Sequence, residues 1–150
     1  PDNARRLLKE GAAILTFPEG MRGIQKRLAD AYRLMPFGPG FVRLALSNGV
    51  PVVPVSVVGS EEQYPTLFHL RRGFHLLDMP PFPIWAHMGI PLLGVLPLPV
   101  KYHIEFGEPL FFEGDPDDDD EVIAKMADTV KTAIGLGVDR MLKARKSVFF

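Results

Sequence analysis

The amino-acid sequence predicts an α/β domain in which a partial mixed or parallel sheet is flanked by helices. Two apolar runs, residues 12–17 and 50–58, have the length of buried strands, and residues 41–47 between them have a helical pattern. A strand, a helix and a second strand in this order form the βαβ unit typical of parallel sheets. Hydrophobic residues make up 47% and charged residues 23% of the chain, which favours a packed core over disorder.

The first elements in chain order are a short helix and a strand. We expect the helix to begin at a cap formed by Asp2 or Asn3 and to end at Gly11. Residues 12–17 (AAILTF) then form the first strand. The loop-rich stretch that follows, residues 18–40, contains several proline and glycine residues.

The second predicted strand follows a short helix. The loop before that helix contains a further helical piece around residues 26–34. The helix over residues 41–47 ends at Asn48 and Gly49. Residues 50–58 are nearly continuous valine, as in a parallel strand that is covered on both faces.

Two loops follow the carboxyl ends of the predicted parallel strands. These loops are residues 18–23 and 59–62, and such loops line the usual ligand crevice of an open α/β sheet. Pro51 and Pro54 are unfavourable in a central strand, so they indicate a sheet edge or a bulge.

Residues 79–100 form a strongly apolar stretch. It is long enough to span a bilayer, but its six prolines argue against a transmembrane helix. The composition favours peripheral contact with one membrane surface. The alternative is that this stretch covers the sheet or belongs to the core.

The C-terminal part is predicted to contain one strand and one long helix. Residues 101–106 alternate as in a half-buried strand, with Tyr102, Ile104 and Phe106 on one face and with His103 and Glu105 on the other, which we expect to face solvent. The acidic residues 115–121 precede a helix to about residue 145. Within this run, residues 117–120 either cap the helix at the positive end of its dipole or bind a cation. The apolar stripe of this helix is Val122, Met126, Val130, Ile134, Val138 and Met141, and Gly135 and Gly137 weaken its middle.

Composition excludes several classes of function. The net charge of -1 lacks the basic surplus expected of a nucleic-acid-binding protein. The absence of cysteine excludes disulfides, thiolate metal sites and a thiol nucleophile. We therefore predict no metal site and no bound cofactor.

Residues 17–23 (FPEGMRG) have the strongest chemical character. Gly20 and Gly23 allow tight turns and close approach to a ligand, and the planar guanidinium of Arg22 suits phosphate. Glu19 would repel phosphate, so it either accepts a hydrogen bond from a substrate hydroxyl or holds Arg22 in place. The loop therefore predicts a phosphorylated polyol as ligand. The alternative is a surface turn with an incidental ion pair.

Three segments resemble a known family. FPEG with an arginine one residue on, after an apolar run, resembles the third conserved block of the glycerol-phosphate and lysophosphatidate acyltransferases. Residues 48–55 (NGVPVVPV) resemble their fourth block, and residues 101–110 (KYHIEFGEPL) the strand and turn that close their domain. We thus predict one domain over residues 1–150, with a family-like region to residue 110 and then an acidic linker and C-terminal helix over residues 111–150.

The resemblance also implies residue roles. Glu19, Gly20 and Arg22 would bind the acceptor substrate, and residues 50–54 would lie near the acyl side. Catalysis in the family belongs to an earlier His-x4-Asp block, whose histidine is the general base. The histidines of this chain have no aspartate five positions on, although His75 has Asp78 nearby; they are His69, His75, His87 and His103. We therefore predict no catalytic residue here, N-terminal truncation and an inactive fragment.

The expected function is that of a phospholipid-type acyltransferase. It would transfer an acyl group from acyl-CoA or acyl-carrier protein, as co-substrate, to a hydroxyl of glycerol phosphate or a lysophospholipid. It would work peripherally, on the cytoplasmic face of a membrane. The alternatives are a non-catalytic lipid- or membrane-binding module and a phosphate-ligand-binding protein.

Overall fold

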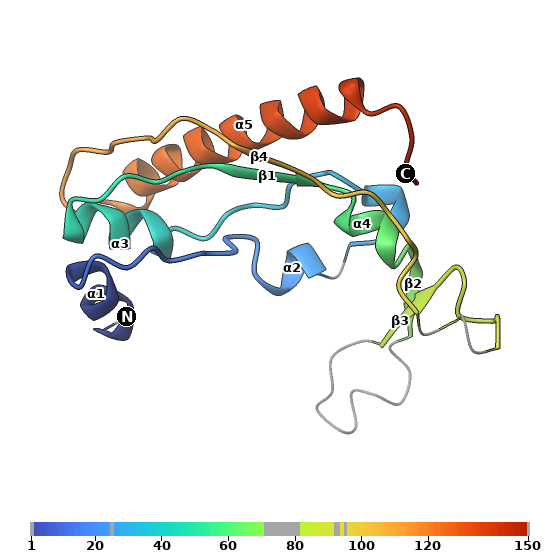
Figure 1. Cartoon of the computed structure of the whole chain (residues 1–150). Coiled ribbons are helices and arrows are strands. Elements are labelled where there is room, and N and C mark those ends of the chain that lie inside the picture. The colour runs from blue at the N-terminus through green and yellow to red at the C-terminus, as the bar shows by residue number, and fades with distance from the viewer. Residues whose placement is uncertain (1, 25, 71–81, 92–93, 95, 150) are drawn as a thin grey trace.

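The computed structural model describes residues 2–24, 26–70, 82–91, 94 and 96–149. Figure 1 shows an elongated arrangement in which the last helix runs along a two-stranded ribbon and a second hairpin projects at one end. The elements in chain order are α1 (Asp2–Lys9), α2 (Met21–Ile24), the 3₁₀ helix η1 (Leu28–Asp30), α3 (Gly40–Asn48), β1 (Val55–Val58), α4 (Ser60–Gln63), β2 (Thr66–Leu70), β3 (Phe82–Trp85), β4 (His103–Phe106) and α5 (Asp120–Ala144).

The β1–β4 ribbon and α5 form the central layer pair. β1 pairs antiparallel with β4, so that Val55 lies opposite Phe106 and Val58 opposite His103. α5 packs along one face of the ribbon (Figure 1), where the Ser56 hydroxyl donates a hydrogen bond of 2.9 Å to the carbonyl oxygen of Ile134. Because α5 is amphipathic and long, it covers the whole length of this face.

Among the described residues, two clusters of buried side chains lie at opposite ends of α5. One contains Val42, Ile123 and Ala127, with Phe37 and Phe41 of the α3 region packed against it. The other joins Val58 of β1 to Val138 and Met141 of α5. Each cluster depends on α5 for two of its buried side chains, so this helix connects the two halves of the molecule.

Glycine at position 137 allows α5 to approach the ribbon closely. A Cβ at Gly137 would lie 2.9 Å from the Cβ of Ser56, which is closer than real Cβ contacts come. The predicted weakening of the helix at Gly137 is therefore offset by close packing. Gly135 differs, because a Cβ there would meet only Leu34 Cδ1, at 3.7 Å.

The expectation of a βαβ unit is wrong for the residues that the structure describes. Residues 12–17 form no strand or helix, and Leu15 is 70% and Phe17 77% exposed. The valine-rich run is a strand only at Val55–Val58, with an isolated antiparallel bridge at Val52. No described strand lies beside residues 12–17, and Pro54 lacks the N–H needed to continue a ladder, so the paired strands described here are antiparallel.

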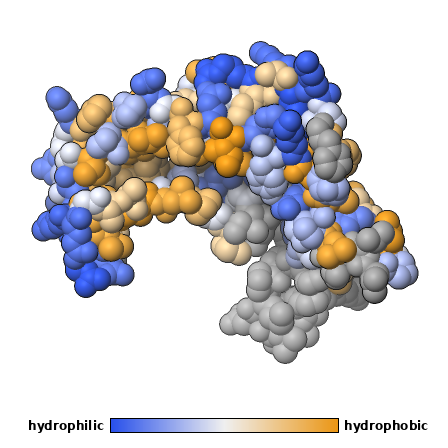
Figure 2. Space-filling model, in the orientation of Figure 1, coloured by the Kyte–Doolittle hydropathy of each residue, from blue (hydrophilic) through white to orange (hydrophobic). Residues whose placement is uncertain are grey.

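The orientation expected for β4 is also wrong. The predicted alternation is present, but Ile104 is 57% and Phe106 73% exposed, whereas His103 and Glu105 face α5. An ion pair between Glu105 and Arg140 of α5 helps to fix this face. Figure 2 shows hydrophobic residues exposed along the hollowed side of the molecule. The reversed strand contributes to this uncovered apolar surface.

Several helix predictions are confirmed. α1 ends before Gly11 at φ 81° and α3 before Gly49 at φ 62°, both in the left-handed region that glycine favours. α5 buries Val130, Val138 and Met141 of the predicted stripe, but at its start Ile123 is buried and Val122 is 40% exposed. The helical piece expected around residues 26–34 is reduced to η1.

The β2–β3 hairpin contains part of the apolar stretch of residues 79–100. Its strands are antiparallel, with Thr66 opposite Trp85 and Leu70 opposite Phe82. Residues 79–81, 92–93 and 95 of the stretch lie outside the described part of the chain. Among the described helices, none is long and apolar enough to cross a membrane.

Candidate functional site

The FPEG loop turns sharply into a single helical turn. Gly20 has φ 57°, and its N–H donates to the carbonyl oxygen of Phe17 at 3.0 Å. α2 then begins at Met21. A Cβ at Gly23 would lie 2.9 Å from Glu19 Cβ, so glycine at this position leaves room for the Glu19 side chain to fold over α2.

The carboxylate of Glu19 points inward. Its Oε1 accepts a hydrogen bond of 2.7 Å from the Met35 N–H, and its Oε2 lies 3.4 Å from Lys26 Nζ. Arg22 is exposed, and it has neither a hydrogen bond nor an ion pair with the described residues. The suggested Glu19–Arg22 pair is therefore not formed in this part of the chain, and the loop presents Arg22 alone to solvent.

Lys26 joins this loop to the loop after β1. Its Nζ lies 2.6 Å from Oε1 of Glu61, and its side chain is only 7% exposed. The two loops expected to line one crevice are thus connected through a buried ammonium group that lies between two carboxylates. Because each carboxylate reduces the cost of burying the lysine charge, the three side chains hold one another in place.

Tyr32 connects α4 to the same loop region. Its backbone, at φ 62°, is in a conformation that is uncommon for residues other than glycine. Its N–H donates to Glu61 Oε2 at 2.6 Å, its hydroxyl donates to Glu62, and the Gly59 N–H donates to that hydroxyl at 2.9 Å. These bonds fix Tyr32 from both its backbone and its ring.

Arg145, just after α5, completes the network. Its Nη1 lies 2.7 Å from Glu62 Oε1, and its guanidinium lies 5.9 Å from the centre of the Tyr32 ring. Burial raises the pKa of Tyr32 to about 12, and the hydrogen bond to Glu62 acts in the same direction. Burial lowers the pKa of Arg145, but the contacts with Glu62 and Tyr32 together raise that pKa overall. The tyrosine thus stays protonated and the arginine charged near neutral pH.

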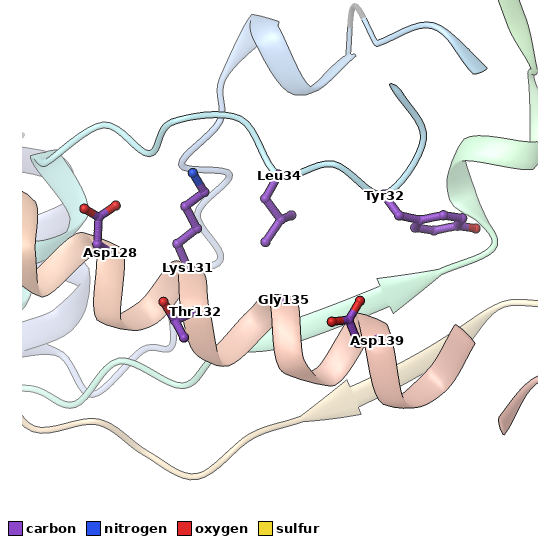
Figure 3. Close-up of a pocket in the computed structure, with 7 residues that line it drawn as sticks. All are labelled: Tyr32, Leu34, Asp128, Lys131, Thr132, Gly135 and Asp139. Carbon is purple, nitrogen blue, oxygen red and sulfur yellow. The ribbon is translucent and has the colours of Figure 1, made fainter. Parts of the chain in front are cut away.

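A shallow groove lies beside this network, because Tyr32 is one of the residues that line it. Figure 3 shows it between α5 and the segment of Tyr32 and Leu34, with a volume of about 510 Å³. Its α5 side carries charges of both signs from Asp128, Lys131 and Asp139. Neither Glu19 nor Arg22 lines it, so it is distinct from the FPEG loop.

The described histidines lie in structural surroundings. His87 is buried, its Nε2 lies 3.0 Å from the Leu96 carbonyl oxygen, and its ring stacks on Tyr64. His103 faces α5 rather than solvent, contrary to its predicted position. His69 lies on β2, whereas His75 and Asp78 fall outside the described residues.

The acidic run is used by the backbone around it. Asp115 Oδ1 accepts from the Asp117 N–H at 2.8 Å, and Asp118 Oδ2 accepts from the Asp115 N–H at 3.1 Å. The N-cap residue Asp119 makes no side-chain cap bond, so the predicted cap takes the form of acidic side chains in the first turn, including Asp120. No group of three or more potential metal ligands occurs among the residues described.

Comparison with known proteins identifies the first part of the chain. Residues 1–58 match the family model described as Acyltransferase. The resemblance drawn from the FPEG loop is confirmed by this match, which includes Glu19, Gly20 and Arg22.

Relatives of this chain include an uncharacterized bacterial protein and two plant enzymes. An uncharacterized protein of Mycobacterium leprae (strain TN) is 40% identical over 155 residues, covering 99% of this chain and 42% of that protein. The chloroplastic 1-acyl-sn-glycerol-3-phosphate acyltransferase of Brassica napus is 40% identical over 60 residues, covering 40% of this chain and 16% of that enzyme. The 1-acyl-sn-glycerol-3-phosphate acyltransferase of Cocos nucifera is 32% identical over 81 residues, covering 54% of this chain and 22% of that enzyme. This chain spans less than half the length of each, and no solved structure matches it.

Proposed function

We propose that the protein transfers a fatty acyl group from acyl-CoA or acyl-carrier protein to a hydroxyl of glycerol phosphate or a lysophospholipid. The observation that carries the proposal is the division of charge in the FPEG loop. Glu19 is held inward by Lys26 and a backbone N–H, while Arg22 is exposed and unpaired among the described residues. The names of the plant relatives, 1-acyl-sn-glycerol-3-phosphate acyltransferases, support a phosphorylated glycerol acceptor.

Arg22 and Gly20 have separate parts in the proposed acceptor site. The guanidinium of Arg22 binds the phosphate through two parallel, charge-assisted hydrogen bonds. Gly20, in the left-handed region, lets the backbone approach the same ligand. Because the Lys26 ammonium offsets the charge of Glu19, that carboxylate repels an incoming phosphate less than an unpaired one would.

The base for the reaction is proposed to come from a His-x4-Asp block outside these 150 residues, since the chain has no such pair. The base removes the proton of the acceptor hydroxyl as that oxygen attacks the thioester carbonyl, and the thiol leaves. A His-x4-Asp block upstream in the full gene favours the enzyme. Its absence favours the alternatives, a non-catalytic lipid-binding or phosphate-binding module.

The test is the kinetics of Arg22 variants of the full-length gene product. In Arg22→Ala the acceptor KM should rise about tenfold or more, since one lost charge-assisted contact is worth about 1.5–3 kcal/mol. The donor KM should stay within about twofold by the same reasoning. Arg22→Lys should restore only part of the affinity, because lysine keeps the charge but loses the planar fork.

Arg5→Ala is the matched control, because Arg5 is an exposed arginine on α1. Circular dichroism should show that every variant is folded. An unchanged acceptor KM in a folded Arg22→Ala protein would remove the phosphate-binding role.

We also propose that the β2–β3 hairpin makes peripheral contact with the cytoplasmic face of a membrane. Its strand β2 exposes Leu67, Phe68 and Leu70 to 49%, 53% and 43%, and Ile90 nearby is 49% exposed. Buried in the interfacial region, such apolar surface contributes about 25 cal/mol per Å². This location would place the acceptor loop within reach of a lipid substrate.

Vesicle flotation of the full-length gene product tests this contact, with the fluorescence of Trp85 as a second measurement. The double variant Phe68→Ser/Leu70→Ser should lose flotation with neutral and anionic vesicles. Leu136→Ser on α5, which removes a side chain that is 57% exposed, should not. Equal flotation of the two variants would refute the assignment to the hairpin.

A further inference from the structure

We propose that Tyr32 and Arg145 are positioning residues that set the loop of residues 18–23 for the acceptor substrate. This inference rests on the proposed function. Neither residue would touch the substrate; both would act through the carboxylates of α4 and through Lys26. The end of α5 is therefore connected to the acceptor loop, although Arg145 lies outside the acyltransferase match of residues 1–58.

Tyr32 lies at the centre of the network. Glu61 accepts its N–H, Glu62 accepts its hydroxyl proton, and Gly59 donates to the same hydroxyl oxygen. A non-glycine residue at φ 62° persists only where its surroundings determine its conformation. These bonds provide that determination, and they attach the residue to α4 and to the turn before it.

Glu61 of α4 connects Tyr32 to the FPEG loop through Lys26. One oxygen of Glu61 accepts the Tyr32 N–H at 2.6 Å, and the other lies 2.6 Å from Lys26 Nζ. The same ammonium lies 3.4 Å from Glu19. Because both oxygens of Glu61 are engaged, a displacement of Tyr32 must move the Lys26 ammonium or break a charged hydrogen bond.

Glu62 of α4 is connected to the end of α5 through Arg145. The side chains of Glu62 and Arg145 are 16% and 13% exposed, so water replaces their contact poorly. Without Arg145, the Glu62 carboxylate would keep, among the described residues, only the Tyr32 hydroxyl as partner. A buried charge that loses its partner is strongly unfavourable, so α4 and Tyr32 should rearrange toward solvent.

Tyr102 provides a control that distinguishes a positioning role from a general effect on stability. The hydroxyl of Tyr102 donates to Gln63 of α4 at 2.6 Å, so it too bonds α4, but within the described part of the chain it makes no hydrogen bond to Lys26 or Glu19. Tyr102→Phe is therefore a matched control for Tyr32→Phe. Each variant removes one hydroxyl and keeps the ring, but only Tyr32→Phe affects the network.

The first experiment is hydrogen exchange of the full-length gene product, in Tyr32→Phe, Arg145→Gln and Tyr102→Phe. The Met35 amide, which donates to Glu19, reports on the loop, and so does the Gly38 amide, which donates to Pro18. We expect both amides to exchange about tenfold faster in the first two variants, as for a lost charged hydrogen bond. Tyr102→Phe should leave them unchanged.

The second experiment measures KM for acyl-CoA and for lysophosphatidate in the same proteins. We expect the acceptor KM to rise about three- to tenfold in Tyr32→Phe and Arg145→Gln, with donor KM and kcat within about twofold. Arg145→Lys should recover part of the acceptor affinity, because it keeps the positive charge opposite Glu62. A purely structural role would instead lower the melting temperature and leave the acceptor KM unchanged.

The outcomes discriminate between the two proposals. Unchanged exchange at the Met35 and Gly38 amides overturns the coupling, whatever the kinetics. Faster exchange with an unchanged acceptor KM, or with equal changes in both KM values, overturns the positioning role. If the wild type transfers no acyl group to lysophosphatidate or to glycerol phosphate, the proposed function fails. Hydrogen exchange then still decides whether Arg145 controls the loop.

Discussion

Two glycines of α5, two residues apart, should respond to alanine with opposite signs. Alanine is favoured over glycine inside a helix by about 1 kcal/mol. At Gly135 the new Cβ would meet only Leu34 Cδ1, at 3.7 Å, which is an ordinary contact. Gly135→Ala should therefore raise the free energy of unfolding by about 1 kcal/mol.

At Gly137 packing should outweigh propensity. The new Cβ would lie 2.9 Å from Ser56 Cβ and closer still to its Oγ. Forcing an extra carbon into a packed interface costs about 1–3 kcal/mol. Displacing the Ser56 hydroxyl from the carbonyl oxygen of Ile134 costs about 1 kcal/mol more. After the propensity gain of about 1 kcal/mol, Gly137→Ala should lower the free energy of unfolding by about 1–3 kcal/mol.

Urea unfolding, followed by circular dichroism, measures both changes. Each kcal/mol should also shift the melting temperature by about 2–4 °C for a protein of this size. Ser56→Gly removes both atoms that clash, so it should be less destabilising in the Gly137→Ala background than in the wild type. A Gly137→Ala protein as stable as the wild type would refute the close-packing argument.

The remaining predictions concern pH, an arginine clamp and activity. The pKa of Tyr32 is about 12 in the folded protein and about 10 in the unfolded chain. Its contribution to stability is therefore fully present below pH 10 and is lost as the pH rises through 12. The difference in unfolding free energy between wild type and Tyr32→Phe should shrink over that range. Arg43 lies 2.7 Å from Asp120 and donates to the carbonyl oxygens of Pro116 and Asp118. Arg43→Ala should therefore lower the free energy of unfolding by about 1–2 kcal/mol, as measured by urea unfolding. Arg43→Lys should lower it less. The purified 150-residue chain should show no acyl transfer above buffer, because an absent base costs about 10²- to 10⁴-fold in rate; heat-sensitive turnover would contradict this.

The sequence allowed local structure to be predicted better than strand pairing. Gly11 and Gly49 marked helix ends correctly, because a left-handed residue after a helix is a local preference of glycine. Residues 12–17 have the composition of a strand, yet a strand also requires a neighbour, and pairing is not encoded within the run itself. The alternation in β4 identified its two faces, but only contact with α5 determined that His103 and Glu105 would face the helix.

The candidate site was predicted in part. The chemical character of Arg22 and the glycines is visible in the loop sequence, because a cation and two turn-forming residues are adjacent there. The role of Lys26 depends on Glu61, which is 35 positions away, and Arg145 is much farther still from Tyr32 along the chain. A lone tyrosine in a loop and a basic residue at the end of a helix are common in proteins for structural reasons. The sequence alone therefore could not show that Tyr32 and Arg145 belong to the site.

The way α5 connects the two core clusters has a consequence for truncation and for proteolysis. A chain cut before Asp120 would keep every residue of the acyltransferase match, yet it would lose Ile123 and Ala127 from one cluster and Val138 and Met141 from the other. A nonsense mutation or a protease cleavage in the exposed acidic turn around Asp117 should therefore unfold the domain while sparing its recognisable motif. Expression boundaries chosen from the family match alone would produce an unstable polypeptide, and boundaries that extend past Arg145 would retain both clusters and the Glu62 ion pair.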